Sequence, residues 1–179
     1  MDTNITADLK MEKDSIERCL RNCNIKIWIA VCVAFAAGVY TVTDTLLSVF
    51  CVENNILISS CYPIILYKFG ILLGDELPVT PQWDIYSIIA LVTGALYLIF
   101  GAVSLKWKRA GLLMAAIHHT LNLVPFLFLL LVGILDFELI YILLVLGLLI
   151  LPICFLVALW NGVIAAFKRE KIQLQNSII

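Results

Sequence analysis

The chain has 179 residues, of which 63% are hydrophobic and 14% are charged, and its mean hydropathy is +1.04. Soluble domains of this length are about 45–50% apolar and about 25% charged. A water-soluble fold could not bury this much apolar surface, so lipid is expected to surround most of the chain. The formal net charge of −1 excludes a broad nucleic-acid-binding face, which would have to be strongly basic.

Residues 1–26 are polar and of mixed charge, and they lack the apolar segment of a cleavable signal peptide. The first apolar stretch is therefore expected to act as an uncleaved signal anchor. Cys19 and Cys23 lie among basic residues just before it. Juxtamembrane cysteines in such surroundings are typical of palmitoylation sites, and unmodified thiols are the alternative. The pair has no other ligands nearby to complete a zinc site.

Four apolar stretches follow, each long enough to cross a hydrocarbon core of about 30 Å as a helix. They cover residues 27–50, 85–105, 110–135 and 139–167, and only three residues separate the last two. Backbone polar groups in lipid must pair within their own segment, and these continuous apolar runs lack the alternating polarity of barrel strands. The sequence therefore predicts an all-α membrane protein, a bundle of four transmembrane helices.

The positive charges indicate how the bundle is oriented. Eleven of the twelve Lys and Arg residues precede the first stretch, join the second to the third, or follow the fourth; Lys68 is the exception. Basic residues concentrate on the cytosolic side of membrane proteins. We therefore expect a cytosolic N-terminal tail (1–26), a cytosolic C-terminal tail (168–179) and one large loop (51–84) on the opposite side.

Small side chains spaced four residues apart occur in every stretch. Lipid removes the hydrophobic drive between helices, so such residues stabilise a bundle by letting backbones approach closely. We expect most of them to face the bundle interior. The pairs are Ala34 and Gly38, Ala90 and Gly94, Gly111 and Ala115, and Ala158 and Gly162.

Five polar residues at membrane depth are candidate functional residues, because such groups are costly in lipid. They are Asp44, His118, His119, Asn122 and Asn161. His118 and Asn122 share a helix face, whereas the two adjacent histidines point about 100° apart and cannot easily grip one metal ion together. Hydrogen bonds between helices and a proton pathway are the two interpretations, and no metal site is expected.

Two further sites are predicted outside the membrane. Cys51 and Cys61 lie at the root of the large loop and within it, on the oxidising side, where they could form a disulfide or remain unpaired. The chain ends Asn-Ser-Ile-Ile. The apolar Ile179, with the hydroxyl of Ser177 two positions before it, suits a PDZ groove, in which a peptide adds a strand to a sheet edge.

The layout resembles that of small animal tetraspan proteins: lysosome-associated transmembrane proteins, MARVEL-like proteins and their small insect four-span relatives. The resemblance is carried by residues 18–23 (RCLRNC), by the basic link 106–109 (KWKR) and by the very short connection at Asp136. It implies an adaptor for sorting, junctions or trafficking, in the plasma membrane or an endolysosomal membrane. The chain departs from the lysosomal members in lacking proline-tyrosine motifs in its tail.

The first hypothesis for function is thus a non-enzymatic adaptor or structural organiser that needs no cofactor. Its partners would be the lipid bilayer, other membrane proteins including a second copy of the chain, and a cytosolic PDZ scaffold. The alternative is a small proton- or ion-linked transporter or channel subunit that uses the polar residues of the first and third stretches. No Ser-His-Asp, paired-carboxylate or HExxH arrangement is apparent, so an enzyme is not expected.

Overall fold

A computed structural model of the protein describes residues 2–50, 85–135 and 139–176. Within these ranges the chain is helical except at Trp107, which forms the bend between two helices, and this confirms the expected all-α class. The four helices are α1 (Asp2–Phe50), α3 (Ile85–Lys106), α4 (Lys108–Leu135) and α5 (Leu139–Asn176). Each covers one of the four apolar stretches, and α1 and α5 continue well beyond theirs.

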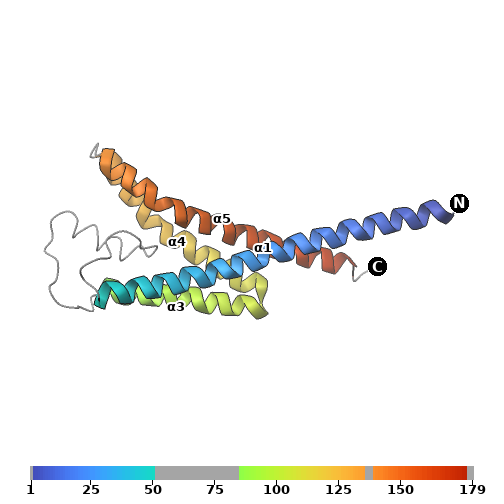
Figure 1. Ribbon diagram of the computed structural model, residues 1–179, viewed down its shortest axis with the longest axis horizontal. Helices are drawn as coiled ribbons and strands as arrows, with labels where there is room; N and C mark the ends of the chain where they lie inside the picture. The colour runs from blue at the N-terminus through green and yellow to red at the C-terminus, as the bar shows by residue number, and fades with distance from the viewer. Residues whose placement is uncertain (1, 51–84, 136–138, 177–179) are drawn as a thin grey trace.

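The helices form a ring in chain order, with neighbours antiparallel (Figure 1). Helices α1 and α4 each pack against both α3 and α5, while α1 and α4 themselves touch only slightly and lie across a diagonal. The arrangement brings the start of α1, the α3–α4 link and the end of α5 to one end of the molecule, which we call the terminal end (Figure 1). Toward the opposite end, the α1–α3 pair diverges from the α4–α5 pair.

Within the part of the chain that the structure describes, three helical segments are long and apolar enough to cross a bilayer: Lys13–Leu46, Ile88–Lys106 and Leu149–Gln175. Their outward-facing side chains include large aliphatic residues that water would solvate poorly, among them Val92, Ile150 and Ile164, each more than half exposed. Lipid contact removes that cost. The protein is therefore a membrane protein.

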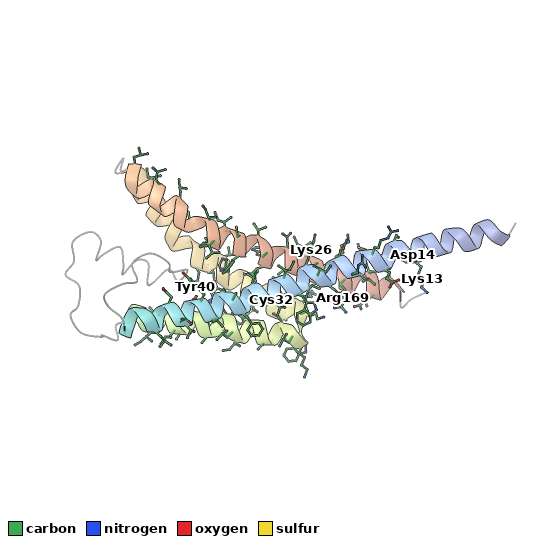
Figure 2. All side chains as sticks on the ribbon, viewed as in Figure 1. Lys13, Asp14, Lys26, Cys32, Tyr40 and Arg169 are labelled. Carbon is green, nitrogen blue, oxygen red and sulfur yellow. The ribbon has the colours of Figure 1, made fainter. Side chains whose placement is uncertain are left out.

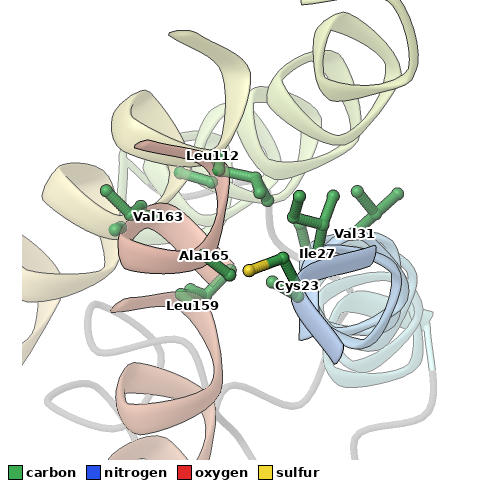
Figure 3. Close-up of a cluster of buried hydrophobic side chains, with 12 residues drawn as sticks. Cys23, Ile27, Val31, Leu112, Leu159, Val163 and Ala165 are labelled. Carbon is green, nitrogen blue, oxygen red and sulfur yellow. The ribbon is translucent and has the colours of Figure 1, made fainter. Parts of the chain in front are cut away.

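The best-packed part of the core lies toward the terminal end, where α1, α4 and α5 meet. Cys23 and Ile27 of α1 contact a cluster that includes Leu112 of α4 and Leu159 and Val163 of α5 (Figure 3). All of these side chains are at most 5% exposed. The first two turns of the apolar stretch of α1 are thus held by two neighbouring helices.

Small residues carry the close helix contacts, as predicted. Seven of the eight are buried and Ala158 is half-buried. A Cβ added at Gly38 would lie 2.7 Å from the Leu98 side chain, and one at Gly94 would lie 2.7 Å from Val42, so α1 and α3 touch backbone to backbone. A Cβ at Gly162 would collide with Ala30, so α5 approaches α1 closely at this point.

Helix α1 has no break between its polar and apolar parts. The sequence contains neither glycine nor proline before Gly38, and a helix that has already formed extends at little cost through residues such as Lys, Glu and Leu. Residues 2–26, which we call the N-terminal arm, therefore continue the helix beyond the α3–α4 link, and their first turns extend past the end of α5 (Figure 1). The end of α5 lies beside the base of this arm (Figure 2).

Candidate functional site

A polar cluster joins α3, α4 and α5 inside the bundle, and His119 is at its centre. His119 is 2% exposed. Its Nε2 lies 2.9 Å from the carbonyl oxygen of Pro152 on α5, and its Nδ1 lies 2.5 Å from the hydroxyl of Tyr97 on α3. Tyr97 is also buried, at 3% exposed. One imidazole therefore links three helices.

The partners of His119 determine where its ring proton lies. A carbonyl oxygen only accepts hydrogen bonds, so Nε2 must carry the proton and donate it to Pro152. The Nδ1 lone pair then accepts the hydroxyl proton of Tyr97. Both ring nitrogens are used in this neutral tautomer, which satisfies the polar groups of a deeply buried side chain.

Asn122 and His118 extend the cluster along α4. The Asn122 amide nitrogen lies 3.4 Å from the Tyr97 hydroxyl and 3.3 Å from Nε2 of His118. The same Nε2 lies 3.4 Å from the carbonyl oxygen of Thr93 on α3. It can accept from Asn122 or donate to Thr93, but it cannot do both in one tautomer. The expected shared face of His118 and Asn122 is thus confirmed.

The other two polar residues predicted at membrane depth lie elsewhere. Asp44 is buried on α1, 9% exposed, one turn from Tyr40 and beside the buried Thr45. The hydroxyl of Thr45 donates to the carbonyl of Thr41, 2.7 Å away, so this part of α1 carries its own polar face. Asn161 is exposed on α5, outside the cluster.

A second, peripheral link joins α5 to α4 beside Asn161. The Trp160 indole nitrogen donates to the hydroxyl of Thr120 at 3.2 Å, and that hydroxyl donates to the carbonyl of Ala116 at 2.7 Å. Both Trp160 and Thr120 are exposed. This link is therefore a useful comparison for the buried one at His119.

The two juxtamembrane cysteines occupy different environments. Cys23 is 5% exposed and packs in the core (Figure 3), whereas Cys19, one turn earlier, is half-buried. Acylation needs an accessible thiol, so of the two predicted palmitoylation sites the geometry favours Cys19. The predicted disulfide (Cys51 and Cys61) and the predicted PDZ-binding residues (Ser177 and Ile179) lie outside the described residues.

The cluster is suited to cross-linking helices. Its hydrogen bonds end on two backbone carbonyls, those of Pro152 and Thr93. Among the described residues, no group of three His, Cys, Asp or Glu side chains could hold a metal ion. No protein-family model matches the chain, and no curated protein and no solved structure matches it either.

Sequence reasoning missed Tyr97, although it pointed to its partners. A tyrosine inside an apolar stretch is a recognisable signal, because a buried phenol hydroxyl usually finds a hydrogen-bond partner. Which residue of α3 lies opposite His119 depends on the register of two antiparallel helices, set here by the tight packing of Gly111 against Ser104 near the link. The sequence does not display that register.

Proposed function

We propose that the protein spans the bilayer four times, with both termini in the cytosol. Helix α4 would be the fourth span, since its 28 residues make a helix about 42 Å long at about 1.5 Å per residue. The sidedness is supported by the position of the basic segments, because the N-terminal arm, the α3–α4 link and the end of α5 share the terminal end (Figure 1). Positive charge favours the cytosolic side.

Within this topology the protein acts as a non-enzymatic adaptor or structural organiser in membrane trafficking or at cell junctions. The observation that carries the proposal is the N-terminal arm, 25 residues of continuous helix (Figure 1), about 37 Å long. Its described charged residues of both signs are all exposed: Lys13, Asp14, Glu17, Arg18, Arg21 and Lys26. Such an arm presents a rigid polar surface to cytosolic proteins and anchors it in the membrane.

The surface of the arm is shaped as well as charged. Asp14, Glu17, Arg18 and Arg21 border a shallow hollow of about 630 Å³ together with Leu20. Charged side chains of both signs beside an apolar one are suited to binding a partner protein of complementary charge. Other membrane proteins, a second copy of the chain and a PDZ scaffold at the C-terminal tail complete the proposed set of partners. The plasma membrane and endolysosomal membranes are the proposed locations.

Proximity labelling in the native cell tests the adaptor role. A labelling enzyme fused to the C-terminus would record the neighbours of the wild-type protein and of a Glu17→Ala/Arg21→Ala variant, which changes two exposed side chains and leaves the net charge unchanged. The matched control is Lys171→Ala/Gln175→Ala, an exposed pair with the same spacing on α5. We expect the arm variant to lose most cytosolic neighbours and the control to keep them. An unchanged neighbour set for the arm variant would contradict the adaptor role.

One observation favours the second candidate, a proton- or ion-linked transporter: the side chains of Tyr97, His119, Asn122 and His118 form a continuous polar chain within the bundle. Flux measured in vesicles containing the purified protein separates the two functions. Transport predicts a pH-driven flux that His118→Gln/His119→Gln abolishes. The adaptor predicts no flux for either protein and an unchanged neighbour set for the folded variant.

A further inference from the structure

A basic hollow lies at the terminal end, between the α3–α4 link and the last turns of α5. It has a volume of about 650 Å³, within the range of roughly 300–1,000 Å³ that ligand pockets occupy. Its charged lining comprises four cations and one anion: Lys106, Lys108, Arg109, Arg169 and Glu170. The formal charge of the lining is therefore +4 − 1 = +3.

Aromatic rings hold three of these cations in place. The Lys108 ammonium lies 5.7 Å from the centre of the Trp28 ring on α1, and the Arg109 guanidinium lies 4.1 Å from the Phe167 ring on α5. Lys106 lies over the ring of the adjacent Trp107. Cation–π contacts of this kind orient a charge without neutralising it. The positive groups are thus arranged before any ligand arrives.

Positively charged side chains lie close together in the hollow. Partial burial and then the nearby charge of Arg169 lower the pKa of Lys108, as expected where two cations lie close together. Arg109 is the one cation with an ion-pair partner within the hollow, since its Nη1 lies 2.9 Å from the Glu170 carboxylate. An anion placed between Lys108 and Arg169 would relieve this repulsion.

The walls place the hollow at the level of lipid headgroups. Its aliphatic lining comprises Ile27, Ala110, Leu113 and Ala166, which belong to the ends of apolar stretches. Trp107 on its rim is 63% exposed, and tryptophan side chains concentrate at the membrane–water interface. Basic pockets between spans on the cytosolic side are suited to phosphorylated lipid headgroups.

We propose that this hollow binds the multiply phosphorylated headgroup of an anionic lipid in the cytosolic leaflet, a phosphoinositide. A headgroup with a single net charge would leave most of the +3 lining unbalanced, whereas two phosphomonoesters match it. Lys108 and Arg169 contact the phosphates, and the acyl chains leave along the apolar wall. The assignment to the cytosolic leaflet rests on the proposed topology.

Binding to the full-length protein in uncharged detergent micelles tests the proposal independently of topology. Thermophoresis would measure the affinity of the protein for three ligands: dioctanoyl phosphatidylinositol bisphosphate, dioctanoyl phosphatidylserine and free inositol trisphosphate. The variant Lys108→Gln/Arg169→Gln removes two charges from the hollow. Its control, Lys168→Gln/Lys171→Gln, removes two exposed charges from the same end of α5 without touching the lining. Gel filtration checks that each protein is folded, and the single variant Arg169→Gln replaces the double variant if the latter aggregates.

We expect the wild-type protein to bind the bisphosphate lipid at least tenfold more tightly than phosphatidylserine. The Lys108→Gln/Arg169→Gln variant should bind the bisphosphate lipid at least tenfold more weakly than the wild type. For the Lys168→Gln/Lys171→Gln control, the affinity for the bisphosphate lipid should fall less than threefold. Equal weakening by the two variants would show a diffuse charge effect and overturn the proposal. Equal affinities of the wild-type protein for the bisphosphate lipid and for phosphatidylserine would overturn the proposal too. If inositol trisphosphate bound as tightly as the bisphosphate lipid, the hollow would be assigned to a soluble ligand instead of a lipid. Protease accessibility of the termini tests the topology separately.

Discussion

Replacing Tyr97 by Phe removes one hydroxyl from the centre of the bundle without changing its shape. The buried Nδ1 of His119 then loses the hydrogen bond that it receives at 2.5 Å, and no water can replace the donor where both side chains are at most 3% exposed. Hydrogen bonds between membrane helices are worth about 0.6 kcal/mol on average and about 1.7 kcal/mol at most. Because this bond is short and fully buried, we expect a loss of about 1 kcal/mol, or about fivefold in the unfolding equilibrium.

A double-mutant cycle isolates that bond. Steric trapping in bicelles would measure the free energies of unfolding of Tyr97→Phe, His119→Leu and the double variant, and we expect a coupling energy of about 1 kcal/mol. The exposed pair Trp160 and Thr120, 3.2 Å apart, serves as the matched control and should couple by less than about 0.5 kcal/mol. A coupling of zero between Tyr97 and His119 would refute the view that the cluster holds α3 and α4 together.

Three further outcomes follow from the packing and the charges. Gly162→Ala should lower the free energy of unfolding by about 1–3 kcal/mol, because its new methyl group collides with Ala30. The control is Gly147→Ala, whose methyl group meets nothing within 4 Å among the described residues. This control should be neutral or stabilising by up to about 1 kcal/mol. In an acyl-exchange assay, Cys19→Ser should abolish palmitoylation and Cys23→Ser should leave most of it, since only the first thiol is accessible; the reverse result would contradict the assignment. Epitopes fused to either terminus should resist protease added outside intact cells, and their cleavage would disprove the proposed sidedness.

The helices and their inward faces were predictable because membrane composition restricts the choices. An apolar stretch in lipid must be helical, so the bounds of α3 differ from those expected only at Lys106. Close contact between helices requires small side chains, which is why Gly38 and Gly94 were expected to face the bundle interior, where they form the α1–α3 contact. Both inferences use one segment at a time and need no knowledge of its neighbours.

The polar cluster and the basic hollow were not predictable in the same way. His118 and His119 were identified as candidates, but their partners Thr93 and Tyr97 depend on how α3 and α4 are aligned. The Pro152 partner is a backbone carbonyl, which a search for polar side chains does not find. The cations of the hollow come from segments about 60 residues apart in the chain, Lys108 and Arg169 among them. The charges had indicated orientation only, because sequence does not show which of them converge.

Helix α1 is held against α4 and α5 between Cys23 and Ala34 and against α3 at Gly38 and Val42, and its first turns extend past the other helices (Figure 1). At about 1.5 Å per residue, roughly 39 Å lies before Trp28 and roughly 33 Å after it. The half after Trp28 is fixed against α3 at Gly38 and Val42, and the half before it continues from this fixed part without a glycine or proline. A load on the N-terminal tip of α1 is therefore carried by continuous helix into the α1–α5 and α1–α3 contacts.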